Sequence, residues 1–287
     1  MSGRRALHWE SSRKEKTVTS RIAKSCAYCD GTERPLTREH IWGETFHDRH
    51  PPHTNFSAKV PEEGVKSDPV IKDVCDKCNN EKLSPLDAFG IGITEKYFIP
   101  SGDGVKPPVH FDYGSFDMFS RWLLKLLYND ARACNQQVEE HAAFRRYILG
   151  EAESPHNFNI FGVLLRPARV PKELVAEVGT DTIYPRDNTM AILVPPEQTG
   201  DRWKLGRMIR FRAFIFFVIV WNDEVDLRAR RETQQAVVGQ YQCTHVHPGR
   251  SYVDLHYTNI NTMRFLFDSH QNDFESVKTL PLEPSNV

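Results

Sequence analysis

The clearest hydrophobic pattern in the chain lies between residues 115 and 134, where apolar side chains recur every three or four positions. This spacing places them on one side of an α-helix. Ser115 is a good N-cap, and Asp117 puts a negative charge in the first turn, where the helix dipole favours it. The pattern therefore predicts a helix with an apolar side made of Phe116, Phe119, Trp122, Leu123, Leu126 and Leu127, with Arg121, Lys125 and Arg132 among its remaining positions. A second helix is expected over about residues 138–149.

The period changes after residue 158. Four segments are rich in β-branched and aromatic residues and are bounded by Pro, Gly, Asn and Asp, which is typical of strands. These segments are Phe158–Leu165, Met190–Val194, Met208–Trp221 and Tyr252–Tyr257. They predict a mostly antiparallel sheet with flanking helices. A further strand is expected at Val70–Val74, and a helix from Asn79 that stops or bends near Ser84–Pro85.

Two stretches divide the chain. Residues 100–114 are rich in Pro and Gly, which predicts a linker or an exposed loop and a domain boundary. Residues 1–24 carry seven Lys or Arg against two Glu, a local excess of seven minus two, or +5. This segment is either a basic arm that follows phosphates or a solvated tail. We expect an arm at 1–24, an N-terminal domain at 25–100 and a helical plus β domain at 115–287.

Composition narrows the class of protein. The formal net charge of the 287 residues is −1, so the chain has no overall basic field of the kind that coats nucleic acid. A local basic groove is still compatible with that charge. The longest apolar run, Ala213–Trp221, is too short to span a bilayer, and residues 1–24 contain no signal-peptide core. We expect a soluble cytoplasmic protein with no membrane partner.

Four of the six cysteines form two Cys-x-x-Cys knuckles, Cys26/Cys29 and Cys75/Cys78, separated by 45 residues. Four thiolates from two such turns are the donor set of a closed tetrahedral zinc site. A redox pair is disfavoured because there are two pairs, and disulfides are disfavoured in a reducing compartment. The zinc would then pin the ends of the inserted segment. Cys134 and Cys243 are expected to be buried free thiols.

The segment between the knuckles carries Leu-Thr-Arg-Glu39-His40-Ile, and the second knuckle continues directly into Asn79-Asn80-Glu81-Lys82. With these motifs, residues 24–90 resemble an HNH endonuclease. The similarity is to the subgroup with Cys-x-x-Cys before Glu-His and Cys-x-x-Cys-Asn after it. The resemblance implies an α+β fold whose N-terminal domain is a zinc-braced ββα-metal unit, a hairpin and a helix around one divalent cation.

The resemblance also implies a role for each matching residue. His40 is similar to the general base, and Glu39 to the acidic metal ligand beside it. Asn79 matches the second metal ligand, or Asn80 if the register shifts by one, and Lys82 matches a Lys that often follows. Asn55 is the candidate for the middle Asn, which orients the loop carrying the base. Oxygen ligands favour Mg²⁺ or Mn²⁺ at this second site.

These motifs predict a metal-dependent endonuclease that hydrolyses phosphodiester bonds in DNA, with RNA not excluded. A near-neutral imidazole suits the activation of water, and a divalent metal suits the charge of a phosphate. Two alternatives stay open: a non-catalytic zinc-braced nucleic-acid-binding module, and a defence effector nuclease gated by a ligand. The role of residues 115–287 is open, and a homodimer is possible.

Overall fold

The computed structural model describes residues 25–40, 70–103, 105–169, 172–178, 182–183, 188–191 and 202–259. The fold is a mixed α+β arrangement of antiparallel sheets and helices. The basic segment 1–24, the candidate Asn55 and the end of the chain beyond residue 259 lie outside the described residues.

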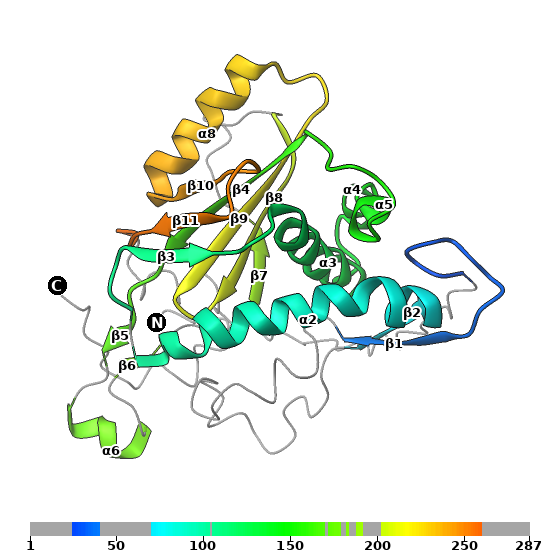
Figure 1. The fold of residues 1–287 in the computed structure, drawn as a ribbon. Coiled ribbons are helices and arrows are strands. Elements are labelled where there is room, and N and C mark those ends of the chain that lie inside the picture. The colour runs from blue at the N-terminus through cyan, green and yellow to red at the C-terminus, as the bar shows by residue number, and fades with distance from the viewer. Residues whose placement is uncertain are drawn as a thin grey trace, which may run out of the picture.

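A five-stranded antiparallel sheet forms the centre of the molecule, in the order β10-β4-β9-β8-β7 (Figure 1). Its strands are β4 (Phe158–Leu164), β7 (Asn188–Ala191), β8 (Trp203–Phe211), β9 (Phe214–Trp221) and β10 (Thr244–Val246). Every residue of β9 is buried. This explains why its sequence is an unbroken apolar run rather than an alternation, since helices cover both faces of the central strand.

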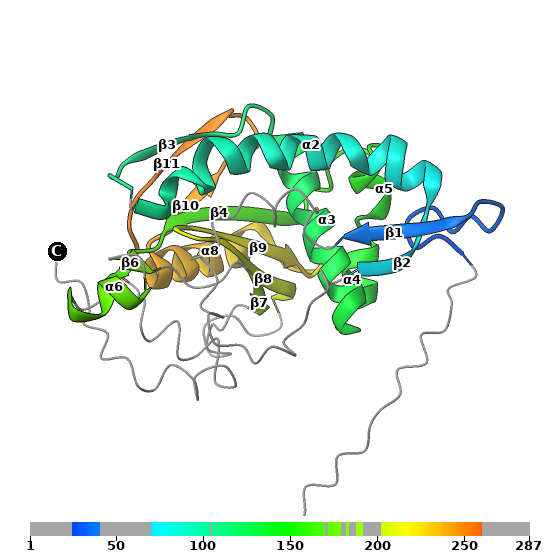
Figure 2. The ribbon, with the colours of Figure 1, turned by 90° about the horizontal axis from the view of Figure 1, so that it is seen from below.

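The two faces of the sheet pack against different helices. On one face, Ile160 of β4 and Phe216 of β9 join a core with Phe119 and Leu123 of α3 (Phe116–Cys134). On the other face, Phe217 of β9 packs with residues of α8 (Leu227–Tyr241). The result is a three-layer arrangement in which the sheet lies between helices. Each amphipathic element buries its apolar side (Figures 1 and 2).

Helix α3 begins and ends where its sequence predicts. The Ser115 side chain accepts a hydrogen bond from the backbone N–H of Met118 at 3.3 Å, which caps the first turn. Asn135 ends the helix in the left-handed conformation, with φ of 53°. The predicted apolar positions of α3 are buried. The buried set extends further, however, because Lys125 and Asn129 are also fully buried.

The N-terminal part is a hairpin followed by a helix. β1 (Leu36–His40) and β2 (Val70–Cys75) pair antiparallel. A π-helical segment (Cys78–Leu83), α2 (Ser84–Ile93) and a second π-helical segment (Thr94–Phe98) then follow in succession. Both views place this hairpin at one edge of the molecule, beside the start of the α2 rod (Figures 1 and 2).

The predicted linker contains ordered structure. A 3₁₀ turn (Pro100–Asp103) leads to β3 (Val109–Asp112), which pairs antiparallel with β11 (Tyr252–Leu255). Phe111 of β3 is fully buried in the same apolar core as Val74 of the hairpin. The expectation of an exposed loop was therefore wrong for β3, because a strand at least 140 residues downstream pairs with it. The division into domains stays a prediction.

Shorter elements complete the described fold. They are α4 (Val138–Ala142), α5 (Arg145–Ile148), β5 (Ala168–Arg169), a 3₁₀ turn (Lys172–Leu174), α6 (Val175–Val178) and β6 (Thr182–Ile183). The predicted helix over residues 138–149 is thus two short helices. β5 and β6 form a small sheet of their own.

Two other sequence expectations need correction. The apolar run Met208–Trp221 is two strands, not one, because the chain turns at Arg212, whose φ is 51°. The helix after the second knuckle was expected to stop or bend near Ser84–Pro85, and it does not stop there. Its hydrogen-bonding changes there from π to α, and Pro85 falls at the start of α2, where a missing N–H is tolerated. Within the described residues, no helix combines the length and the apolar character needed to cross a membrane.

Candidate functional site

The four knuckle cysteines meet at the base of the hairpin. The sulfur atoms of Cys26, Cys29, Cys75 and Cys78 all lie within 4.8 Å of one another. Cys75 is the last residue of β2 and Cys78 opens the helical rod, so the second knuckle is the junction between strand and helix. The first knuckle precedes β1. The cluster therefore ties the beginning of the hairpin to its end, as the sequence predicts.

Backbone N–H groups point at these sulfurs. The N–H of Cys75 donates to Cys26 Sγ at 3.3 Å, and the N–H of Cys78 donates to Cys75 Sγ at 3.5 Å. The first knuckle closes through Asp30, which has φ of 58° and donates its N–H to the carbonyl of Cys26 at 2.9 Å. Asp tolerates this left-handed conformation better than most residues. Both turns thus aim a pair of sulfurs at one point.

The geometry of the four thiols fits a zinc ion. A tetrahedral site with Zn–S bonds of about 2.3 Å has sulfur-to-sulfur edges of about 3.8 Å. Cys29 Sγ and Cys75 Sγ are 3.8 Å apart. That separation is far longer than the bond of about 2.05 Å in a disulfide, and all four cysteines are free. Four sulfur donors in this arrangement select zinc over the harder cations.

The electrostatics of the cluster also call for a cation. Burial favours the neutral thiol of Cys26, but backbone donors, above all the N–H of Cys75, outweigh it and lower the pKa of Cys26. Burial raises the pKa values of Cys29 and Cys78, and at Cys78 the neighbouring sulfurs raise it further. Thiolates this close together repel one another, and a bound dication would offset that repulsion. Zn²⁺ would supply that charge, and the site residues would supply structure rather than chemistry.

The pairing of β1 with β2 is irregular at the candidate residues, because its register shifts between Thr37 and Glu39. Asn79 lies against β1 before that point. Its side-chain amide donates to Thr37 Oγ1 at 3.0 Å and to the Arg38 carbonyl at 2.9 Å. Asn79 therefore contacts the strand that carries Glu39 and His40, one and two residues before them.

Glu39 is buried, with 3% of its surface exposed, and its carboxylate faces α3. Its Oε1 atom lies 2.7 Å from the ammonium of Lys125 and accepts a hydrogen bond from Asn129 Nδ2 at 3.1 Å. Lys125 also forms an ion pair with Asp87 of α2. One buried ammonium is therefore shared by two carboxylates that come from different elements.

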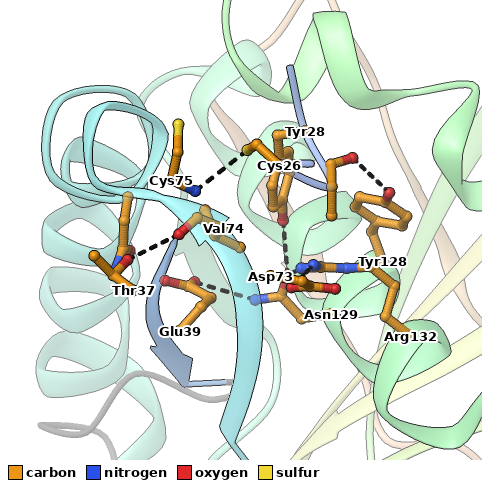
Figure 3. A network of polar contacts seen from close by, with 12 residues as sticks. Cys26, Tyr28, Thr37, Glu39, Asp73, Val74, Cys75, Tyr128, Asn129 and Arg132 are labelled. Carbon is orange, nitrogen blue, oxygen red and sulfur yellow. Dashed lines mark hydrogen bonds and ion pairs between the residues drawn. The ribbon is translucent and has the colours of Figure 1, made fainter. Parts of the chain in front are cut away.

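Asn129 connects the first Cys-x-x-Cys turn to strand β1 (Figure 3). Its Oδ1 accepts from the hydroxyl of Tyr28, inside the first knuckle, at 2.7 Å. Its Nδ2 donates to Glu39 and, at 3.4 Å, to the carbonyl of His40. Burial raises the pKa of Tyr28 well above its usual range, so this hydroxyl stays protonated and donates. A single amide thus bridges the zinc knuckle and the Glu39–His40 segment.

A second set of contacts clamps the last turns of α3 to the same edge. Arg132 forms an ion pair with Asp73 of β2, and its guanidinium lies 5.0 Å from the Tyr28 ring and 4.5 Å from the Tyr128 ring (Figure 3). The Tyr128 hydroxyl donates to the carbonyl of Ala27 at 2.8 Å. The Arg132 guanidinium, the two tyrosine rings and the Tyr128 hydroxyl together hold the first knuckle against α3.

The remaining candidates are placed as follows. His40 is half-buried at the end of β1. Asn80 is exposed, and Lys82 lies 3.8 Å from the carboxylate of Glu151. Asn55 lies outside the described residues. Among the residues that the structure describes, the four cysteines are the one cluster of His, Cys, Asp or Glu side chains able to hold a metal.

Sequence reasoning missed the contribution of α3. Lys125 was expected among the positions outside the apolar face, yet it is fully buried. One signal for this was present. The run Trp122-Leu123-Leu124-Lys125-Leu126-Leu127-Tyr128 is apolar on nearly every side, which leaves no strip for a solvated charge. Of the two other cysteines, Cys243 is buried as predicted, whereas Cys134 is exposed near the end of α3, so that prediction was wrong.

The α+β arrangement and a four-cysteine cluster fit for structural zinc are the features of the prediction that the geometry supports. Comparison of the chain with protein-family models, with curated proteins and with solved structures gives no match.

Proposed function

We propose that the protein is a zinc-braced endonuclease that hydrolyses phosphodiester bonds in DNA, with His40 as the general base. One observation carries the proposal: the four-sulfur cluster joins the start of a hairpin to the hairpin–helix junction, with Glu39-His40 ending the first strand and Asn79 beside Cys78. This order of elements is what the resemblance to HNH endonucleases implies. RNA is an alternative polymer for the same chemistry.

In this proposal the His40 imidazole removes a proton from the attacking water, and the bond from phosphorus to the 3′ oxygen breaks. The products carry 5′-phosphate and 3′-hydroxyl ends. An imidazole is suited to this step because its ordinary pKa lies near neutrality. Asn129 holds the backbone of His40, because its Nδ2 donates to the carbonyl of that residue.

The expected Mg²⁺ or Mn²⁺ would supply charge stabilisation of the phosphate when bound. As described, however, the carboxylate of Glu39 is committed to Lys125 and Asn129. It is not an open metal ligand in this arrangement, and we assign no step to a cation there. A requirement for Mg²⁺ or Mn²⁺ stays a prediction, to be read from the metal dependence of cleavage.

A different observation, the ion pair of Glu39 with Lys125, favours a second candidate function. A hairpin whose acidic residue is neutralised by Lys125 suits a zinc-braced module that binds nucleic acid without turnover. Such a module would need the four cysteines but not His40. The two functions differ in one outcome, the cleavage of DNA.

Digestion of supercoiled plasmid by the zinc-loaded full chain separates them. With Mn²⁺ or Mg²⁺ present, we expect the wild type to produce nicked or linear DNA and His40→Ala to be slower by about 10²-fold or more. His110→Ala is the matched control, because this exposed histidine lies on β3, away from the hairpin. Equal cleavage by His40→Ala would reject the assigned base. Binding of DNA without cleavage by any variant would favour the module.

A further inference from the structure

The fully buried side chain of Asn129 makes four hydrogen bonds where α3 meets the hairpin (Figure 3). Its Oδ1 accepts from the Tyr28 hydroxyl at 2.7 Å and from Arg132 Nη2. Its Nδ2 donates to Glu39 Oε1 at 3.1 Å and to the His40 carbonyl at 3.4 Å. A carboxamide has two donor hydrogens and an oxygen with two lone pairs. These bonds therefore use the whole hydrogen-bonding capacity of the amide.

The four partners permit only one orientation of the Asn129 amide. Its oxygen faces two groups that donate, a hydroxyl and a guanidinium, and its nitrogen faces two groups that accept, a carboxylate and a carbonyl. Half a turn of the amide would place its oxygen against Glu39 and its N–H groups against Arg132. Buried polar groups without a partner are costly, so the turned amide is disfavoured. The donors on the knuckle side thus orient the amide, and the amide holds the main chain at His40.

This contact pattern distinguishes Asn129 from its neighbours on α3. Lys125, one turn earlier, forms ion pairs with Glu39 and Asp87, and Arg132 forms one with Asp73. Asn129 bonds both members of the Glu39-His40 pair and also the first knuckle. An aspartate in its place would have the same shape but would offer only acceptors when ionised.

We infer that Asn129 is a positioning residue for His40, oriented from the first Cys-x-x-Cys turn by the Tyr28 hydroxyl. The inference rests on the proposed function in taking His40 as the base. It deepens that proposal by making α3, which lies outside the segment 24–90 that resembles HNH endonucleases, a part of the site. Asn129 acts through the main chain of His40 and has no chemical step of its own.

The first test is a double-mutant cycle on DNA cleavage by the zinc-loaded full chain. Asn129→Asp keeps the bonds to Tyr28 and Arg132 but turns an acceptor toward Glu39 and His40. We expect kcat to fall about tenfold or more with KM little changed, because the base is displaced and the bound DNA is not. In a His40→Ala background the same change should slow cleavage no further. Equal slowing in both backgrounds would show a general structural role and overturn the inference.

A second readout does not use cleavage. Carbethoxylation by diethyl pyrocarbonate, followed by mass spectrometry of peptides, reports how reactive each histidine is. The rate at His40 should rise several-fold in Asn129→Asp, while the rate at the exposed His110 stays the same. Asn135→Asp, at an exposed position after the last turn of α3, is the matched control and should change neither rate. A folded Asn129→Asp protein with the wild-type rate at His40 would overturn the inference.

Tyr28→Phe covers the case in which Asn129→Asp fails to fold. It removes only the hydroxyl that orients the amide from the knuckle. The rate at His40 should rise in the same direction, with zinc content unchanged. Tyr128→Phe is the control, because its hydroxyl bonds the Ala27 carbonyl and not Asn129. A rate at His40 that Tyr28→Phe leaves unchanged would contradict the assigned role.

The two readouts separate this inference from the proposed function. A chain that cuts no DNA but shows the change at His40 would reject the nuclease and leave Asn129 as the residue that holds His40. Cleavage that depends on His40 but is unaltered by Asn129→Asp would reject the role of Asn129 alone.

Discussion

The hairpin region and the central sheet are held together by different forces. The hairpin, its two knuckles and the facing turns of α3 are joined by four thiols and by buried ions and amides. The sheet is joined by apolar packing, with β9 buried along its whole length. Polar contacts and a four-cysteine cluster fit for zinc are thus concentrated in one region, and continuous apolar burial in the other.

The aromatic packing around Phe98 makes the contrast concrete. Its ring stacks on Phe211 of β8 at 4.4 Å between centroids and contacts Phe111 of β3 at 6.3 Å. At the hairpin, by comparison, Tyr28 and Tyr128 contact each other edge to face and are capped by the Arg132 cation. Aromatic side chains pack only against one another in one place and also contact a buried cation in the other.

The two regions should therefore differ in their response to pH and to chelators. Apolar burial is insensitive to pH and to chelators, whereas thiolate–metal bonds depend on both and ion pairs depend on pH. The proposed function lies in the hairpin region, where polar side chains of α3 contact Glu39 and His40. The sheet supplies a rigid support for α3, which carries those side chains to the hairpin.

Cys75→Ser should have the largest effect. Structural zinc contributes folding free energy on the order of 10 kcal/mol, so loss of one thiolate should unfold the hairpin region. Zinc content should fall from one ion per chain to none, while hydrogen exchange in β9 stays slow. Cys134→Ser is the matched control, because Cys134 is exposed and outside the cluster. A Cys75→Ser protein that keeps one zinc ion and slow hydrogen exchange in the hairpin would contradict the proposal that Cys75 is a zinc ligand.

Arg132→Ala should be the next most damaging change. It leaves Asp73 without its buried cation and removes the charge from between two tyrosine rings. Breaking a buried pair by removing one partner costs about 3–5 kcal/mol, which urea denaturation would measure. Arg228→Ala, which breaks the exposed pair with Glu232, should cost at most about 1 kcal/mol. Equal costs for the two variants would remove the distinction between buried and surface charges.

Gly90→Ala tests the packing of α2 on α3. A Cβ at Gly90 would lie 2.2 Å from the indole nitrogen of Trp122, so the helices must separate or the ring must move. Overpacking of this kind costs about 1–3 kcal/mol. Gly92→Ala on the same helix meets no atom within 4 Å and should stabilise by about 0.5–1 kcal/mol. Thermal unfolding of the two variants should therefore shift in opposite directions.

The sheet side should also show a pH dependence of stability. Burial lowers the pKa of His141 and of His245, so both are neutral in the folded state. The unfolded chain binds more protons below its histidine pKa of about 6.5, so stability is complete above that pH and falls as the pH drops below it. The slope is at most about 1.4 kcal/mol per pH unit for each group. Replacing both by Gln should flatten the stability curve between pH 7 and 5; an unchanged slope would point to other groups.

The sequence predicted the elements that depend on local pattern. The spacing of Phe119 and Leu123 predicted α3, and the β-branched run predicted β9. The paired Cys-x-x-Cys turns predicted the four-cysteine cluster. Each of these signals depends on residues that are close together in the sequence. Side-chain partners were harder. Nothing near residue 39 indicates that Lys125 neutralises Glu39, since that contact arises from the packing of α3 on the hairpin.

The pairing of β3 with β11 was unpredictable for the same reason. Val109–Asp112 is four residues long and follows a Pro-rich stretch, so its local pattern indicates a loop. Its partner lies over 140 residues downstream, and the pairing depends on how the chain returns to it. Long-range pairing is a property of the whole fold, which no window of sequence contains.

Zinc K-edge X-ray absorption of the purified wild-type chain tests the central claim most directly, since every proposed role at the hairpin depends on the metal cluster. The account predicts one zinc per chain with four sulfur neighbours at about 2.3 Å. A zinc shell of nitrogen or oxygen atoms, or a folded chain that contains no zinc, would contradict it.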